Sequence, residues 1–212
     1  MSGRNEMPVK RSKPVKKKKV NIDLSNLNIK TIGIVIIAVI ILFLIISGIR
    51  GCSVKQNTPQ NVVKSMINFA YKGNAKKVKR CYDINDSDVD QLDRENEALI
   101  KYLQVHNSKG IEIVDTGVLY EGEQYSYVYI TYNLLLDDEQ KYPCIGTYIA
   151  ANKDGKYYIV PTSNVTEEMS STATEKYKDF TESRAYKMYL TTYDTFIKKN
   201  PGYEEKIADK LK

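Results

Sequence analysis

Histidine and cysteine are scarce in this chain, and their scarcity argues against several classes of site. The 212 residues include one His and three Cys. A zinc ribbon or a His-rich metal site draws its ligands from clustered Cys and His side chains, so the composition argues against both. The sequence also lacks the P-loop, GxGxxG, GxSxG and HExxH motifs of phosphate, dinucleotide, serine-hydrolase and metalloprotease sites. We therefore expect no metal, no cofactor and no catalytic activity.

Basic residues are concentrated at the N-terminus. The formal net charge is +6, but residues 1–30 hold nine Lys or Arg against two acidic residues, whereas residues 51–212 hold 22 basic and 24 acidic residues. A nucleic-acid-binding domain would carry its basic patch on the folded part, so nucleic acid is not an expected partner. Because residues 1–30 have almost no apolar side chains before Val20, they are predicted to form a disordered, basic cytoplasmic tail.

An uncharged apolar segment follows this tail. No charged residue lies between Lys30 and Arg50, and the run from Ile32 to Ile49 is almost wholly aliphatic. Eighteen helical residues span about 27 Å, which is close to the hydrocarbon thickness of a bilayer. A buried helix of a soluble protein would show a polar stripe at this length, and this segment has none. The sequence therefore predicts a transmembrane helix over residues 31–50, with the lipid bilayer as a partner.

The flanking charges predict the orientation of this helix. Nine Lys or Arg precede the segment, and only Arg50, Lys55 and Lys64 follow it closely. Because Lys and Arg are retained on the cytoplasmic side, the N-terminus is predicted to be cytoplasmic. Residues 51–57 would then form a linker, and the rest of the chain would lie outside the cell membrane.

Cys52 allows more than one interpretation. Ile49, Gly51 and Cys52 resemble a bacterial lipobox, but Arg50 stands where a small residue is expected. The basic region is also long for a signal peptide, which favours an uncleaved signal anchor. Processing and lipidation at Cys52 is the alternative, and an ordinary thiol beside the membrane is the third interpretation.

The pattern of apolar residues after the linker predicts an α+β domain. Thr58-Pro59 is typical of a helix start, and apolar residues then recur at helical spacing in three segments that end near Lys109-Gly110. From Ile111 the period changes to two, with turns at 121–123, 137–139 and 153–156. Three helices and about four antiparallel strands are predicted, with the helices on one side of the sheet.

The C-terminal part is predicted to be helical again. The segment from Glu167 to Lys199 has a helical apolar face that includes Tyr177, Phe180 and Phe196. Pro201-Gly202 would end this helix, and a short helix would follow over 203–211. Residues 163–212 are therefore predicted to be a helical extension that either packs on the open face of the sheet or offers a surface to a partner.

Two stretches resemble a known superfamily. The sequence from Thr58 to Ala75, TPQNVVKSMINFAYKGNA, and the ending NKDGKYYIV at 152–160 are similar to bacterial extracytoplasmic domains of the nuclear transport factor 2-like, or cystatin-like cone, superfamily. The resemblance covers about 56–162 and includes domains of unknown function; Tyr157 stands where Trp is common. It implies a cone-shaped domain over 58–162, with about three helices on a curved antiparallel sheet. Such domains serve as enzymes, binding pockets and scaffolds, so the resemblance does not define an activity.

Candidate site residues are few. His106, the single histidine, follows an amphipathic helix and is predicted to be exposed or to cap that helix. Tyrosines of the predicted strands either fill a half-buried face of the sheet or line a pocket in the cone. The pocket candidates are Tyr125, Tyr127, Tyr129, Tyr148 and Tyr157.

Two cysteines follow the predicted anchor. Cys81 falls on a helix and Cys144 on a strand, and disulfides are permitted outside the membrane. Either they form a bridge between helix and sheet, or they are two buried free thiols.

These observations predict a single-pass, membrane-anchored extracytoplasmic binding or interaction module without catalytic activity. Another membrane or cell-surface protein is the expected partner, and a small-molecule ligand is an alternative. A scaffold subunit of a Gram-positive conjugation or secretion channel is a second interpretation, since such scaffolds combine a cytoplasmic tail, one span and domains of this fold. An isomerase-like or dehydratase-like enzyme that uses the cone pocket is a third.

Overall fold

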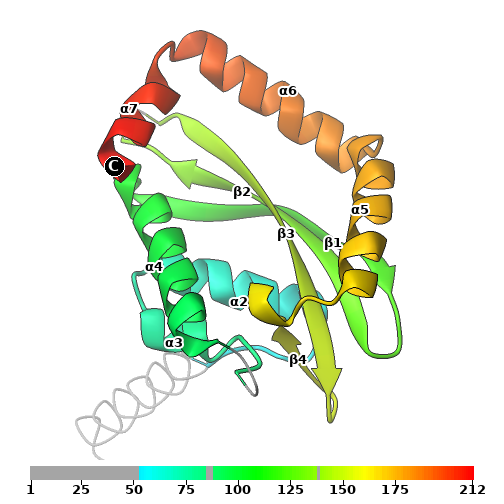
Figure 1. The fold of residues 1–212 in the computed structure, drawn as a ribbon. Helices are drawn as coiled ribbons and strands as arrows, with labels where there is room; N and C mark the ends of the chain where they lie inside the picture. Colours follow the sequence, from blue (N-terminus) through cyan, green and yellow to red (C-terminus); the bar gives the residue numbers. More distant parts are fainter. Residues whose placement is uncertain (1–52, 85–87, 138) are drawn as a thin grey trace, which may run out of the picture. The chain divides into compact units, whose positions relative to one another are not determined.

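The computed structural model describes residues 53–84, 88–137 and 139–212. The predicted tail, the predicted transmembrane segment and Cys52 lie outside these residues. The helices are α2 Pro59–Tyr71, α3 Ala75–Lys79, α4 Val89–Val105, η1 Thr162–Asn164, α5 Glu167–Thr181, α6 Arg184–Lys199 and α7 Tyr203–Leu211. The strands are β1 Gly110–Glu121, β2 Tyr125–Leu135, β3 Lys141–Lys153 and β4 Lys156–Ile159. The α+β class is as predicted, as is the order of three helices, four strands and a helical C-terminal part (Figure 1).

In the part of the chain that the structure describes, no helix combines the length and the apolar character that a bilayer crossing requires. The span predicted over 31–50 lies outside that part.

Helix α2 forms one layer of the core. Thr58 is its N-cap, with a side chain that accepts a hydrogen bond from the Asn61 N–H at 3.2 Å, and Pro59 occupies the first turn. Val62, Met66 and Ile67 recur at helical spacing and are fully buried against the sheet. Burial of this face, rather than helix propensity, is therefore the main source of the helix's stability.

The sheet is antiparallel, with strand order β1-β2-β3-β4. The tight turn before β4 uses Asp154 and Gly155, whose φ angles are 51° and 75°, as the Asp-Gly pair predicts. The short strand β4 pairs only with the end of β3, between Ala150 and Lys153. The preceding part of β3 is therefore an edge of the sheet.

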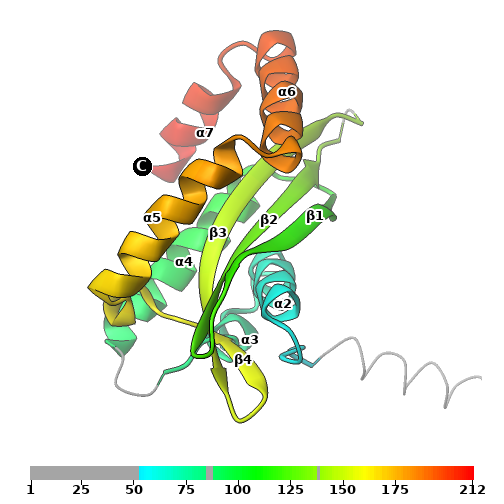
Figure 2. The ribbon, with the colours of Figure 1, turned by 90° about the vertical axis from the view of Figure 1, so that its right-hand side faces the viewer.

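Both faces of the sheet are covered. Val128, Ile130 and Leu134 of β2 point into the core with α2, and Tyr125 and Tyr127 point to the opposite face because side chains alternate along a strand. Figure 2 shows α2 and α5 on the two sides of the sheet.

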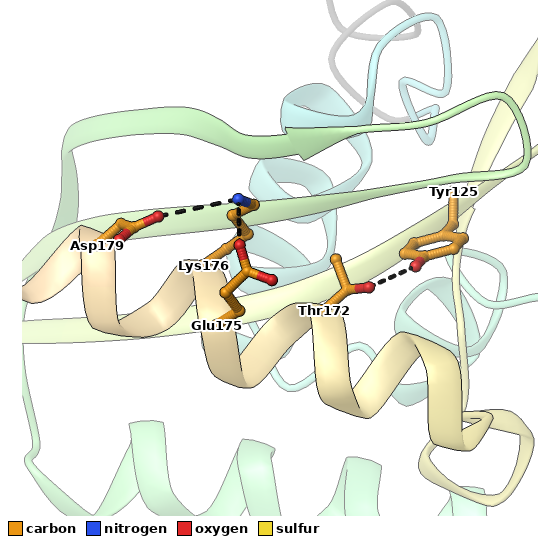
Figure 3. Close-up of polar contacts among 5 residues, drawn as sticks. All are labelled: Tyr125, Thr172, Glu175, Lys176 and Asp179. Atoms are coloured by element: carbon orange, nitrogen blue, oxygen red, sulfur yellow. Dashed lines mark hydrogen bonds and ion pairs between the residues drawn. The ribbon is translucent and has the colours of Figure 1, made fainter.

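The C-terminal extension packs on the open face of the sheet. Met169 and Ala173 of α5 contact the cluster around Tyr125, whose hydroxyl donates to Thr172 Oγ1 at 3.1 Å (Figure 3). Lys176 of the same helix lies 2.7 Å from a Glu175 oxygen and 3.9 Å from an Asp179 oxygen.

The helix predicted to run unbroken from Glu167 to Lys199 is in fact two helices. Ser183 separates the two helices, because its side chain accepts a hydrogen bond from the Tyr186 N–H at 3.2 Å and thereby caps the N-terminus of α6. This cap was missed because the apolar pattern continues through the junction with little interruption.

Beyond α6, the short helix α7 returns to α4, where Lys101 Nζ donates to the Leu211 carbonyl oxygen at 2.6 Å.

Candidate functional site

A cleft of about 520 Å³ lies between α4 and the edge of β3. Its walls are mainly aromatic and aliphatic. They come from α4, β2, β3, β4, the segment that leads from β4 into α5, and Tyr82 after α3. The lining residues are Tyr82, Glu95, Leu99, Tyr127, Thr147, Tyr148, Ile149, Ile159, Val160, Thr162 and Val165. A concave, largely apolar site with a few polar groups is typical of a binding site for a ligand or a peptide.

Glu95 is the acidic side chain of this cleft. It lies one helical turn from Leu99 on α4 and is half-buried. One carboxylate oxygen accepts a hydrogen bond from Gln91 Nε2 at 2.8 Å, and the other accepts one from Thr162 Oγ1 at 3.0 Å. Because both donors are neutral, the negative charge of an ionised carboxylate has no compensating cation in these contacts. Glu95 is therefore oriented to accept from a cationic ligand group.

Tyr82 and Tyr148 of the cleft are neutral at physiological pH. Burial raises the pKa of Tyr148 to about 12, with Cys144 as a smaller cause. Burial also raises the pKa of Tyr82, as do nearby Tyr148, Cys81 and Glu95. The Tyr82 hydroxyl lies 3.1 Å from Met66 Sδ, and the Tyr127 hydroxyl donates to Thr147 Oγ1 at 2.9 Å. The polar groups of the walls are therefore mostly held by neighbouring side chains.

The five tyrosines proposed from the sequence are divided among three environments. Tyr127 and Tyr148 line the cleft, and Tyr157 packs against the edge of the core. Tyr125 is covered by α5, and the Tyr129 ring lies 4.5 Å from the Phe180 ring. Periodicity placed these side chains on strands, but it gave no information about which face the C-terminal helices would cover.

Tyr82 and Glu95 lie in the cleft but were not predicted from the sequence. Tyr82 follows α3, and Glu95 lies on α4. The candidates proposed from the sequence are all tyrosines of the strands, whereas the structure supplies the carboxylate from α4. The one available signal was the i, i+4 spacing of Gln91, Glu95 and Leu99, which places them along one side of the helix.

His106 caps α4, one of the two roles predicted for it, but it is not exposed. It is the C-cap residue of this helix, and only 7% of it is exposed. The imidazole stacks on Tyr142 with ring centroids 4.6 Å apart, and Nδ1 lies 2.8 Å from the Tyr203 hydroxyl. Burial, with a smaller effect from Lys210, lowers the pKa of His106 to about 4. His106 does not line the cleft. It is a neutral side chain within the aromatic cluster that packs against α7.

Cys81 and Cys144 are buried free thiols, the second of the two alternatives left open by the sequence, and no bridge joins them. The Cys81 carbonyl oxygen accepts from the Ile159 N–H at 2.8 Å, and Ile159 pairs with Ala150. Cys144 lies six residues before Ala150 on β3, or roughly 20 Å along the strand. Cys81 therefore lies beside the later part of β3, whereas Cys144 lies near its start. Because a disulfide requires Cα atoms within about 7 Å, the two cysteines are too far apart to be bridged. Burial raises the pKa of each thiol to about 12.

Comparisons with known proteins give distant likenesses only. No family model matches the chain, and no curated protein matches it. A Campylobacter jejuni structure, provisionally named an NTF2-like transpeptidase, has a TM-score of 0.37 and 15% identity, and the match covers 50% of this chain and 99% of that one. An NTF-2-like protein of unknown function from Shewanella oneidensis MR-1 has a TM-score of 0.34 and 12% identity, and covers 46% of this chain and 88% of its own. Values this low carry no argument about activity.

Proposed function

We propose that this chain is a single-pass, membrane-anchored extracytoplasmic module that binds a ligand or partner and has no catalytic activity. The cleft between α4 and β3 carries the binding part of the proposal, because its apolar walls surround one carboxylate without a cation. The anchor part rests on the uncharged segment between Lys30 and Arg50 and on the basic residues before it.

We further infer that residues 58–162 form a nuclear transport factor 2-like cone. Three helices that precede an antiparallel sheet, and the closing turn at Asp154-Gly155, support this inference. In this arrangement α5 covers the outer face of the sheet, and the cleft lies beside the edge of β3. The cone would serve as a rigid frame for the binding site.

An isomerase-like or dehydratase-like enzyme is the second candidate. Glu95 shares the cleft with Tyr82 and Tyr148, and a carboxylate beside a phenol can perform general acid–base catalysis. However, both Glu95 oxygens already accept hydrogen bonds. This arrangement favours a fixed acceptor for a bound group over a base that removes a proton.

The topology can be tested by thiol labelling of sealed cells. Cys81 and Cys144 are buried, so a chain with Cys52 replaced by Ser has little reactive background. We expect Ser171→Cys, at an exposed position of α5, to react with a membrane-impermeant maleimide in intact cells. The matched Ser12→Cys chain should react only after permeabilisation. Labelling of Ser12→Cys but not Ser171→Cys in intact cells would reverse the proposed orientation.

The cleft can be tested with a tryptophan reporter, because the chain has no tryptophan of its own. In full-length protein carrying Val165→Trp, titration with phenethylamine should give a saturable fluorescence change, since its ring suits the apolar walls and its ammonium suits Glu95. Adding Glu95→Gln should weaken binding about tenfold through loss of a charged partner. The exposed Glu97→Gln on the same helix is the matched control. Equal binding of 3-phenylpropionate, which carries the opposite charge, would contradict the proposal.

A further inference from the structure

The edge of β3 beside the cleft presents backbone groups for pairing. The Ile149 carbonyl oxygen accepts from the Val160 N–H at 2.9 Å on the β4 side, whereas the Asn152 N–H donates to the Gln124 carbonyl at 3.1 Å on the β2 side. Successive residues of a strand direct their backbone groups to opposite sides, and the β2–β3 pairing runs without a register shift. Ile145 and Thr147 therefore direct their N–H and C=O groups away from β2.

This part of the edge is open. The strand β4 ends its pairing at Ala150, and within residues 53–84, 88–137 and 139–212 no hydrogen bond joins another element to the outward groups of Ile145 or Thr147. Pro143, near the start of β3, also directs its backbone away from β2. As a proline it has no backbone N–H, so no donor is left unpaired at that position. There α6 packs beside Pro143 and Cys144. The open edge therefore runs from Ile145 to the N–H of Ile149, whose carbonyl oxygen is already bonded to the Val160 N–H.

The open edge and the cleft are one place on the molecule. Thr147, Tyr148 and Ile149 belong to both, and β3 is the strand on the side of the sheet toward α4 and α5 (Figure 2). An added strand would place alternate side chains toward α4, where Glu95 lies, and toward Val165 on the other wall. Among the described residues, no Lys or Arg forms an ion pair with Glu95.

We propose that the cleft binds an extended peptide segment of a partner protein, which pairs with Ile145–Ile149 as an additional strand and places a Lys or Arg side chain on Glu95. Backbone hydrogen bonds would give affinity, and the pocket for alternate side chains would give specificity. This inference rests on the proposed binding function of the cleft and specifies the chemistry of its partner.

Peptide binding by the full-length protein tests this inference. The probe is an array of capped hexapeptides with one fixed Lys and with Val, Ile, Thr or Tyr elsewhere. We expect a subset to bind, to lose at least about tenfold in affinity when Glu replaces the Lys, and to lose a similar factor when alternate backbone amides are N-methylated. Glu95→Gln should weaken the Lys peptides, and Glu97→Gln should not.

A variant of the strand gives a second measurement. Ile145→Pro removes one outward N–H, as Pro143 already does two residues earlier, and near-UV circular dichroism reports whether the domain still folds. In folded protein we expect loss of peptide binding with retention of phenethylamine binding.

The outcomes separate the two proposals. If phenethylamine binds the cleft but no peptide of the array does, or if N-methylated peptides bind equally well, strand addition is wrong and the binding function stands. If neither probe binds, both proposals are wrong.

Discussion

Phe180→Ala is expected to lower the free energy of unfolding by about 3 to 5 kcal/mol, the usual cost of removing a buried ring. Phe180 is 2% exposed and joins α5 to the sheet and to α6. Its ring centroid lies 4.5 Å from that of Tyr129 and 5.5 Å from that of Tyr186. Loss of the ring would leave a cavity between the sheet and the C-terminal extension. Urea denaturation of the full-length chain, followed by near-UV circular dichroism, measures the effect.

Tyr177→Ala provides the matched comparison on the same helix. Tyr177 is 39% exposed, so we expect it to cost about 1 kcal/mol or less. If Phe180→Ala were equally mild, α5 would not be packed on the sheet in solution. The result therefore decides whether residues 163–212 are an integral layer of the domain.

Acidification is expected to destabilise the domain through His106. The unfolded chain takes up a proton on this side chain near pH 6.5, whereas burial holds the folded pKa at about 4. Since the unfolded state binds more protons between these values, the free energy of unfolding falls as the pH decreases from about 6.5 to 4. The contribution lost over this range is about 3 kcal/mol.

The groups around His106 define the control for this measurement. Tyr102, Tyr142 and Tyr203 contact the imidazole, and Lys210 and Glu204 of α7 act on it with opposite signs. His106→Phe keeps an aromatic ring and removes the titration, while every carboxylate stays. We expect the parent chain to lose about 3 kcal/mol more than His106→Phe between pH 7 and pH 4. Parallel pH profiles for the two chains would show that His106 is not the cause.

Local patterns were sufficient to predict most helices and strands. The spacing of Val62, Met66 and Ile67 predicts one buried helical face, and the alternation of Tyr125, Tyr127 and Tyr129 predicts a strand. The Asp154-Gly155 pair predicts its turn for a steric reason, the positive φ angles. The break at Ser183 was missed, because one capping side chain is a weak signal inside a long apolar pattern.

Contacts between distant segments could not be predicted in the same way. A strand pattern shows that two sets of side chains face apart, but it does not show which set lines a cleft. Tyr125 and Tyr129 are covered because α5 packs on them, and Tyr127 and Tyr148 border the cleft because β4 ends early. Glu95 joins them from α4, more than 50 residues before Tyr148 in the chain, so no local spacing relates the two.

The sequence by itself determined the α+β class, the order of the helices and strands, and the separation of a basic, apolar N-terminal part from the rest. These properties depend on residues within a few positions of one another, where helix and strand periods act directly. Only the tertiary structure decided the buried state of His106, the separation of Cys81 from Cys144, and the meeting of Glu95 with the open edge of β3. Each of these depends on packing between segments far apart in the chain. The burial of a residue and the charges around it can be determined only once that packing is known.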